Sequence, residues 1–260
     1  MFDIKVIKDA LSIDHAEKRW PVRFLFLFVF TIEILSLMRP LGNQDLTVLF
    51  RWYESVYGAF TSSDPASLDL YSIMIIPPEV IQNFIYMIFV LLKFFFYLLL
   101  VFYASGLYIG ERKKILPAKM FVQYIKRLPW LFVFLFVMCV FVFIFMMMTV
   151  IVPFLFSFVI IVIPFLFLSA NLIIIDKKNP IDAWIYCVRY SRGKRFWLIF
   201  KILMIYMLYN LVYRFLLLFV PPGSPGSMMI GAALFAYLLC TIGRLSGIYY
   251  YKVNVSELFV

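Results

Sequence analysis

The chain has 260 residues, of which 65% are hydrophobic and 15% are charged, whereas an ordinary soluble domain is about half apolar. A soluble core could not bury this many Phe, Leu and Ile side chains, so the composition argues against a soluble protein and favours membrane spans. The net charge of +10 does not indicate nucleic-acid binding, because the basic residues are divided among short segments that flank the apolar runs.

The first half of the chain is predicted to cross the membrane twice. Residues 1–20 are predicted to form a cytoplasmic elbow, a short amphipathic segment leading into span 1 at residues 21–38. Residues 43–80 form an extracytoplasmic amphipathic segment, in which the wide aromatic face of residues 44–60 indicates a helix lying in the interface. Span 2 is predicted at residues 80–108.

The middle of the chain is predicted to contain a second elbow and a membrane hairpin. Residues 109–128 are basic and form the elbow, whereas residues 129–175 contain no charged residue. At about 1.5 Å per residue, that uncharged run gives roughly 70 Å of helix, enough for two crossings of a ~30 Å core. Span 3 is therefore predicted at residues 129–151 and span 4 at residues 154–175, with a tight turn near Pro153.

The last part of the chain repeats the pattern of elbow and hairpin. Residues 176–196 form the third elbow, followed by span 5 at residues 197–220, span 6 at residues 228–250 and a tail at residues 251–260. The predicted fold is thus an all-α polytopic membrane protein with six transmembrane helices in three elbow-plus-hairpin units.

The distribution of Lys and Arg predicts the orientation. Seventeen of these residues lie in the three elbows and the tail, whereas the predicted outer segments carry only Arg39 and Arg51. Positively charged segments stay on the cytoplasmic side. We therefore expect a multi-pass protein of the cell membrane with both termini in the cytoplasm.

The elbows share sequence features that suggest internal repetition. KRWPVRFLFLFV at residues 18–29 aligns with KRLPWLFVFLFV at residues 126–137, and a further Lys-Arg pair precedes span 5. Helices that begin at Pro117 and Pro180 precede the second and third pairs. Each elbow helix is predicted to lie on the inner leaflet with its basic residues at anionic headgroups; the alternative is a basic flank with a chance helix. The predicted contacts with anionic lipids or a partner are Lys126, Arg127, Trp184, Arg189, Arg192, Lys194 and Arg195.

The third elbow resembles a known family. Pro180-x-x-Ala183-Trp184 and Ser191-Arg192-Gly193-x-Arg195 precede span 5 and follow a hairpin without a polar loop. The combination resembles an uncharacterised group of bacterial six-span proteins that includes the YciC-like proteins and the membrane domain fused to some glycerophosphodiester phosphodiesterases. The resemblance implies a six-span fold over most of residues 1–250, although residues 43–80 are longer than it leads us to expect, and it implies little chemistry.

Charged residues inside predicted spans are the other candidates for function. Glu33, Lys93 and Arg214 lie at depths that allow them to meet in the outer half of the membrane. Such a cluster would attract an anionic substrate or headgroup. The alternative is a structural salt bridge between spans 1, 2 and 5, with the remaining base reaching outward.

The sequence gives no sign of an enzyme. Its one histidine, His15, lies in the first elbow, and no metal-binding spacing, nucleophile motif or phosphate-binding loop is present. Cys139, Cys187 and Cys240 lack metal or redox spacing, so neither a disulfide nor a metal or cofactor site is predicted. We expect transport or handling of a lipid or amphiphile without an ATPase of its own. The alternative is a non-catalytic module that supports a protein partner or homo-oligomer, or that shapes the inner leaflet.

Overall fold

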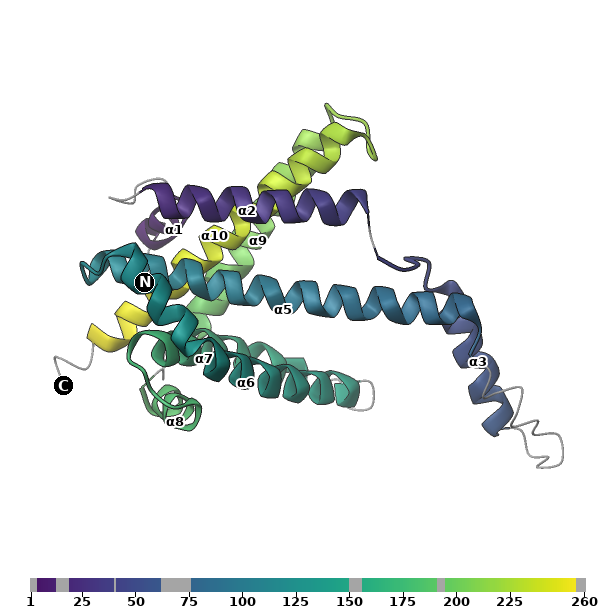
Figure 1. The fold of residues 1–260 in the computed structure, drawn as a ribbon, viewed down its shortest axis with the longest axis horizontal. Coiled ribbons are helices and arrows are strands. Elements are labelled where there is room, and N and C mark those ends of the chain that lie inside the picture. Colours follow the sequence, from purple (N-terminus) through teal and green to yellow (C-terminus); the bar gives the residue numbers. More distant parts are fainter. Residues whose placement is uncertain are drawn as a thin grey trace. The chain divides into compact units, whose positions relative to one another are not determined.

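The structure is entirely helical over the residues it describes. The computed structural model describes residues 4–12, 19–39, 41–61, 76–149, 156–190 and 195–255. Within these ranges the regular elements are all α-helices, which confirms the predicted all-α class (Figure 1). The helices are α1 (Ile4–Leu11), α2 (Arg19–Met38), α3 (Thr47–Thr61), α5 (Pro78–Arg112), α6 (Pro117–Thr149), α7 (Phe156–Ile175), α8 (Pro180–Tyr190), α9 (Arg195–Leu217) and α10 (Pro225–Val255).

Several of these helices are long and apolar enough to cross a membrane. Over the described residues there are five such stretches, at Trp20–Met38, Pro78–Arg112, Pro117–Val142, Phe196–Leu217 and Pro225–Val253. The chain is therefore a multi-pass membrane protein. The sixth predicted span, at residues 154–175, corresponds to α7, whose described apolar stretch Val162–Ile175 is shorter. Six spans stay a prediction, and the turn near Pro153 lies outside the described residues.

The chain divides into two compact units. The larger unit comprises Met1–Thr31 and Tyr97–Val260, and the smaller unit comprises Ile32–Phe96. Helices α2 and α5 each contribute one part to either unit.

Close helix packing defines the core of the larger unit. Helix α10 meets the second half of α5 at Gly243 and Gly247, where the glycines allow the two backbones to approach. Helix α7 packs against α6, α8, α9 and α10, and its last three turns are almost fully buried. In Figure 1, α6 and α7 lie side by side. These contacts bring the ends of α5, α7 and α10 together.

A polar contact is buried in the centre of this core. Asn171 of α7 accepts a hydrogen bond from Ser105 Oγ of α5 at 2.7 Å, and it donates to Ser246 Oγ of α10 at 2.8 Å. All three side chains are buried, so leaving any of them without its partner would cost free energy. Asn171 therefore links α7 to both α5 and α10.

The smaller unit holds the predicted interfacial helix. The helix expected at residues 44–60 is α3, at Thr47–Thr61. The segment that leads into α3 is held in place by the buried Asn83 of α5. The Asn83 side chain donates hydrogen bonds to the carbonyl oxygens of Asn43 at 2.9 Å and Asp45 at 2.8 Å. Gly42 has a φ of 81°, and a side chain there would collide with the backbone of Gln82.

The second elbow differs from the prediction. A helix does begin at Pro117, but it continues through Pro129 to Thr149 as the single helix α6. The predicted boundary between residues 109–128 and 129–151 is therefore not a helix boundary. An interior proline removes one hydrogen bond and favours a kink, yet apolar helices tolerate it.

The bounds of the other helices lie close to the predicted ones. Helix α8 begins at Pro180, as predicted, and α5 extends to Arg112 rather than residue 108. Helix α10 begins at Pro225, three residues earlier than predicted. Ser224 caps that helix, because its Oγ accepts a hydrogen bond from the Ser227 amide at 3.2 Å.

Candidate functional site

The structure pairs two of the three charged residues predicted to form an intramembrane cluster. Lys93 Nζ of α5 lies 2.9 Å from Glu33 Oε2 of α2, and it donates a hydrogen bond to Ser36 Oγ at 2.6 Å. The side chains of Lys93 and Glu33 are only 21% and 12% exposed. Ser36 was not predicted, although it shares a helix face with Glu33 at a spacing of three residues.

The third residue of that cluster belongs to the other compact unit. Arg214 lies in the last turn of α9, and its side chain is exposed. The cluster of three therefore stays a prediction, whereas the Glu33–Lys93 pair with Ser36 is a complete ion pair within the smaller unit.

A basic groove in the larger unit contains two of the predicted headgroup contacts. Its volume is about 680 Å³, and one face of the first four turns of α6 forms most of its wall. No acidic side chain is among the described residues that line it. The lining residues are Ala118, Lys119, Val122, Gln123, Lys126, Arg127, Trp130 and Lys177.

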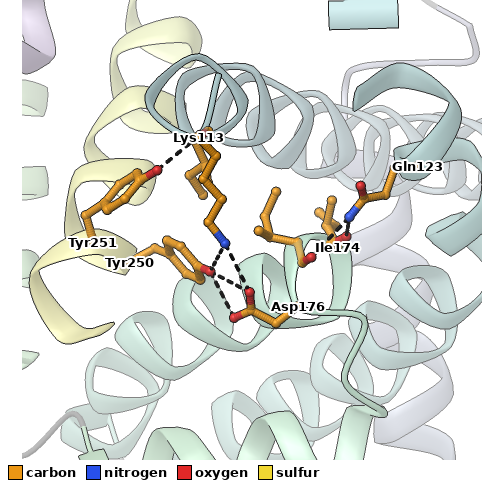
Figure 2. Close-up of polar contacts among 8 residues, drawn as sticks. Lys113, Gln123, Ile174, Asp176, Tyr250 and Tyr251 are labelled. Carbon is orange, nitrogen blue, oxygen red and sulfur yellow. Dashed lines mark hydrogen bonds and ion pairs between the residues drawn. The ribbon is translucent and has the colours of Figure 1, made fainter. Parts of the chain in front are cut away.

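Hydrogen bonds hold α6 and the end of α7 in the positions that form this groove. Gln123 Nε2 donates to the carbonyl oxygens of Ile174 at 2.7 Å and Ile175 at 3.1 Å (Figure 2). These carbonyls lie in the last turn of α7, where they have no partner within the helix. Lys177, two residues beyond Ile175, thereby lies against the basic face of α6.

Lys177 adopts a conformation that glycine usually adopts. Its φ is 56°, and the amide of Lys178 returns to the carbonyl of Leu172 at 3.3 Å. Lys177 thus occupies a left-handed position just beyond the end of α7, where helices commonly have glycine. A side chain other than glycine or asparagine costs about 1–2 kcal/mol there, and such strain collects at functional sites.

A second left-handed lysine lies at the end of α5, where the hydrogen bonds are those of a Schellman motif. Lys114 has a φ of 55°; its amide bonds the carbonyl of Glu111 at 3.0 Å, and the amide of Ile115 bonds that of Gly110 at 2.7 Å. Lys114 lines a separate cavity of about 370 Å³. Each of the two connections that precede a proline-initiated elbow therefore places a left-handed lysine against a cavity.

A neighbouring charged cluster joins the ends of three helices. Tyr250 of α10 donates to Asp176 Oδ1 at 2.7 Å, and Lys113 Nζ lies 3.3 Å from the same oxygen and 3.0 Å from Tyr250 Oη. Figure 2 shows Lys113 reaching from α5 toward both groups. Asp176 compensates the charge of Lys113, so this cluster anchors α5, α7 and α10 to one another.

Helix α1 is held on α10 by a second ion pair. Arg244 Nη2 lies 2.7 Å from Asp9 Oδ1, and Arg244 Nη1 donates to the carbonyl of Ser12 at 2.6 Å. The guanidinium also lies over the ring of Tyr108, 5.1 Å from its centroid. These contacts tie the N-terminal helix to the bundle.

The third elbow presents an apolar stripe more clearly than a binding site. Ile181 is 73% exposed, and Ile185 and Val188 are also exposed. Trp184, a predicted contact residue, instead packs on Phe165 with ring centroids 5.1 Å apart. Arg189 is exposed. Arg192 and Lys194 lie outside the described residues, as does the side chain of Arg195.

The sequence alone missed some residues of the groove. Lys119 shares the polar helix face of Lys126 at a spacing of seven residues, but it was not included among the predicted contacts. Lys177 has no such signal, because its place depends on the left-handed turn and on the packing of α7 against α6. Lys201 of α9 lies inside predicted span 5 and is buried, but it was not among the charged residues identified as candidates.

Comparison with known proteins adds nothing to this geometry. No family model, no curated protein and no solved structure matches the chain, so the resemblance to the YciC-like family stays a prediction. Within the described ranges, no three His, Cys, Asp or Glu side chains are grouped to hold a metal ion. All three cysteines are free thiols.

Proposed function

We propose that the chain binds the anionic headgroup of a membrane lipid in the basic groove of α6, and that it handles such lipids or related amphiphiles in the cell membrane. The observation that carries the proposal is the convergence of Lys119, Lys126, Arg127 and Lys177 on one groove without an acidic side chain among its described lining. Lys and Arg bind phosphate through charge-assisted hydrogen bonds, and the Arg guanidinium can do so in a bidentate manner.

The course of α6 suits a ligand that has both a charged head and apolar chains. Trp130, an interfacial residue by type, lines the end of the groove. Apolar side chains that remain exposed on α6 precede and follow it, which supports a site at the level where headgroups meet acyl chains. These side chains are Phe121, Val122, Ile125, Phe132, Val133 and Phe136.

The predicted orientation places this groove at the inner leaflet. Anionic lipids there attract a basic segment by about 1 kcal/mol for each Lys or Arg. The sequence contains no ATP-binding motif, so we infer that any lipid movement is passive, driven by a gradient or powered by a partner. We assign no reaction to the protein. The closed ion pair of Glu33 with Lys93 supports a structural role for those residues.

The second candidate function is a non-catalytic membrane module. The exposed stripe of Ile181, Ile185 and Val188 on α8 supports it, because such a stripe suits either the acyl boundary of the inner leaflet or the apolar surface of a partner. A lipid-binding groove and an interfacial elbow are compatible within one protein.

Native mass spectrometry of the full chain in detergent tests the proposal. Phosphatidylglycerol is titrated into the wild type and into a variant with Lys119→Ala, Lys126→Ala and Arg127→Ala. The loss of three cations at ~1 kcal/mol each weakens binding by roughly a hundredfold. Lys5→Ala, at an exposed lysine that does not line the groove, is the control. Equal affinity of the triple variant and the control would refute the proposal.

A further inference from the structure

We propose that the basic groove of α6 takes a headgroup with two phosphates joined by a short glycerol bridge, as in cardiolipin. The proposal rests on the proposed function, because it names the lipid that the same groove would bind. Basic pockets beside membrane helices on the cytoplasmic side bind headgroups of this kind. Three features of the groove support it: its excess of positive charge, the spacing of its cations along α6, and an amide group that lies between them.

The positive charge of the groove exceeds what one phosphate neutralises. The cations that line it are Lys119, Lys126, Arg127 and Lys177. Over the described part of the chain, none of these four side chains forms an ion pair with an acidic residue. The single phosphodiester of phosphatidylglycerol would leave most of this charge uncompensated, whereas a headgroup with two phosphodiesters compensates twice as much.

The cations of α6 fall into two groups along the helix. Lys119 lies in the first turn of α6, and Lys126 and Arg127 follow two turns later. At about 1.5 Å per residue, the seven residues between Lys119 and Lys126 place them roughly 10 Å apart along the axis, on nearly the same face. Two phosphates on a short bridge can contact both groups at once, because the flexible lysine stems take up differences in length.

Gln123 lies between the two groups and is oriented by the end of α7. Its amide nitrogen donates to the carbonyl oxygens of Ile174 at 2.7 Å and Ile175 at 3.1 Å, so the nitrogen is turned toward α7 (Figure 2). Gln123 Oε1 accepts no hydrogen bond from the described residues, and the residue lines the groove. An amide oxygen is an acceptor, so at this point it suits the free hydroxyl of a bridging glycerol and not a further anionic oxygen.

Exposed apolar side chains flank both groups of cations. Close to Lys119 in the sequence, Leu116 and Phe121 are each about half exposed. One turn beyond Arg127, Trp130 is exposed to a similar extent. Cardiolipin carries acyl chains on both of its phosphates, whereas a lipid with a phosphorylated sugar carries them on only one. Apolar surface beside both groups therefore favours a ligand with chains on both phosphates.

The first test compares two lipids in the same variants. The full chain in detergent is titrated with cardiolipin and with phosphatidylglycerol, and binding is read by native mass spectrometry for the wild type, Lys119→Ala and Arg127→Ala. Coulomb attraction scales with the charge of the ligand. Loss of either cation should therefore weaken phosphatidylglycerol binding by about fivefold and cardiolipin binding by about twenty-five-fold. Each lipid is compared with itself, so the contribution of its acyl chains cancels. Lys5→Ala is the control and should change neither affinity.

The outcomes distinguish failure of the two-phosphate ligand from failure of the groove. Unchanged affinity for both lipids in both variants would refute the groove as a headgroup site. Equal loss for the two lipids would keep the groove but overturn the two-phosphate ligand, because only one phosphate would then enter. Cardiolipin binding that depends on Arg127 but not on Lys119 would overturn it as well.

Two altered forms of the ligand complete the test. Deoxycardiolipin has the same phosphates and chains but lacks the hydroxyl of the bridging glycerol, so it should bind about fivefold more weakly, the usual size for one hydrogen bond. Equal binding would overturn the placement of the bridge at Gln123. Deacylated cardiolipin, the soluble headgroup, should bind far more weakly than the lipid, because it has no apolar chains to bury. Binding as tight as that of cardiolipin would assign the groove to a soluble bisphosphate and overturn the lipid.

Discussion

The close approach of α10 to α5 makes Gly243→Ala a sensitive test of the packing. A Cβ at Gly243 would lie 2.5 Å from Ala104 Cβ and 2.7 Å from the carbonyl oxygen of Val101, whereas carbon atoms in contact are normally about 3.5–4.0 Å apart. The helices must therefore separate by roughly 1 Å, and overpacking of this kind costs about 1–3 kcal/mol.

The same separation would act on the buried polar contact. Ser246, one turn beyond Gly243, accepts a hydrogen bond from Asn171 at 2.8 Å. Stretching this bond by about 1 Å breaks it and adds about 1 kcal/mol to the cost. Alanine has a higher helix propensity than glycine, which offsets about 1 kcal/mol of this loss of stability. We therefore expect Gly243→Ala to lower the free energy of unfolding by about 1–3 kcal/mol.

The assay is unfolding of the detergent-solubilised protein by SDS, followed by circular dichroism. Gly231→Ala in the same helix is the control, because its nearest neighbour, Tyr213, would be at an ordinary 3.5 Å. That variant should unfold at or above the wild-type midpoint. If Gly243→Ala unfolds at the same SDS fraction as Gly231→Ala, the packing of α10 on α5 described above is incorrect.

Two further predictions concern the smaller unit. Glu33→Gln leaves Lys93 without its counter-charge in an apolar setting, so it should lower the unfolding free energy by about 1–3 kcal/mol. Adding Lys93→Met to the same chain should restore most of this loss. A double variant that is no more stable than Glu33→Gln alone would contradict the pairing. Hydrogen bonds from the side chain and then the amide of Thr47 lower the pKa of the Asp45 carboxyl. A lowered pKa means that the stabilisation is present above the unfolded-state pKa of about 3.9 and is lost as the pH falls through the folded value. Protection of the α3 amides, corrected for the intrinsic exchange rate at each pH, should therefore fall in acid below about pH 4. Asp45→Asn should remove this dependence, and the same fall in protection in Asp45→Asn would assign it to another group.

The positions of helices could be predicted from the sequence where a single sequence property determines them. Long apolar runs located α2, α5, α9 and α10 within a few residues, because only a helix satisfies its own backbone in a membrane. The start of α8 at Pro180 followed from the preference of proline for the first helical position. Lys126 and Arg127 were identified as headgroup contacts from their place at the membrane flank, and the structure places both in the groove.

The parts that sequence did not predict depend on backbone conformation or on distant packing. The second elbow and span 3 were predicted as separate segments that meet at residue 129, but α6 continues through Pro129. Nothing in a Lys-Lys pair shows that Lys114 and Lys177 are left-handed. Lys177 becomes part of the groove only because the end of α7 packs on α6, which a local pattern does not encode.

The most direct test of the central claim is the substitution Lys177→Gly, with stability and phosphatidylglycerol affinity measured on the same protein. Relief of the left-handed strain should raise the unfolding free energy by about 1 kcal/mol, while loss of one cation should weaken binding by about fivefold. Lys177→Ala, which removes the charge but keeps the strained backbone, should lose the affinity without the gain in stability. A Lys177→Gly protein that is more stable and binds phosphatidylglycerol as tightly as the wild type would contradict a lipid-binding role for the groove.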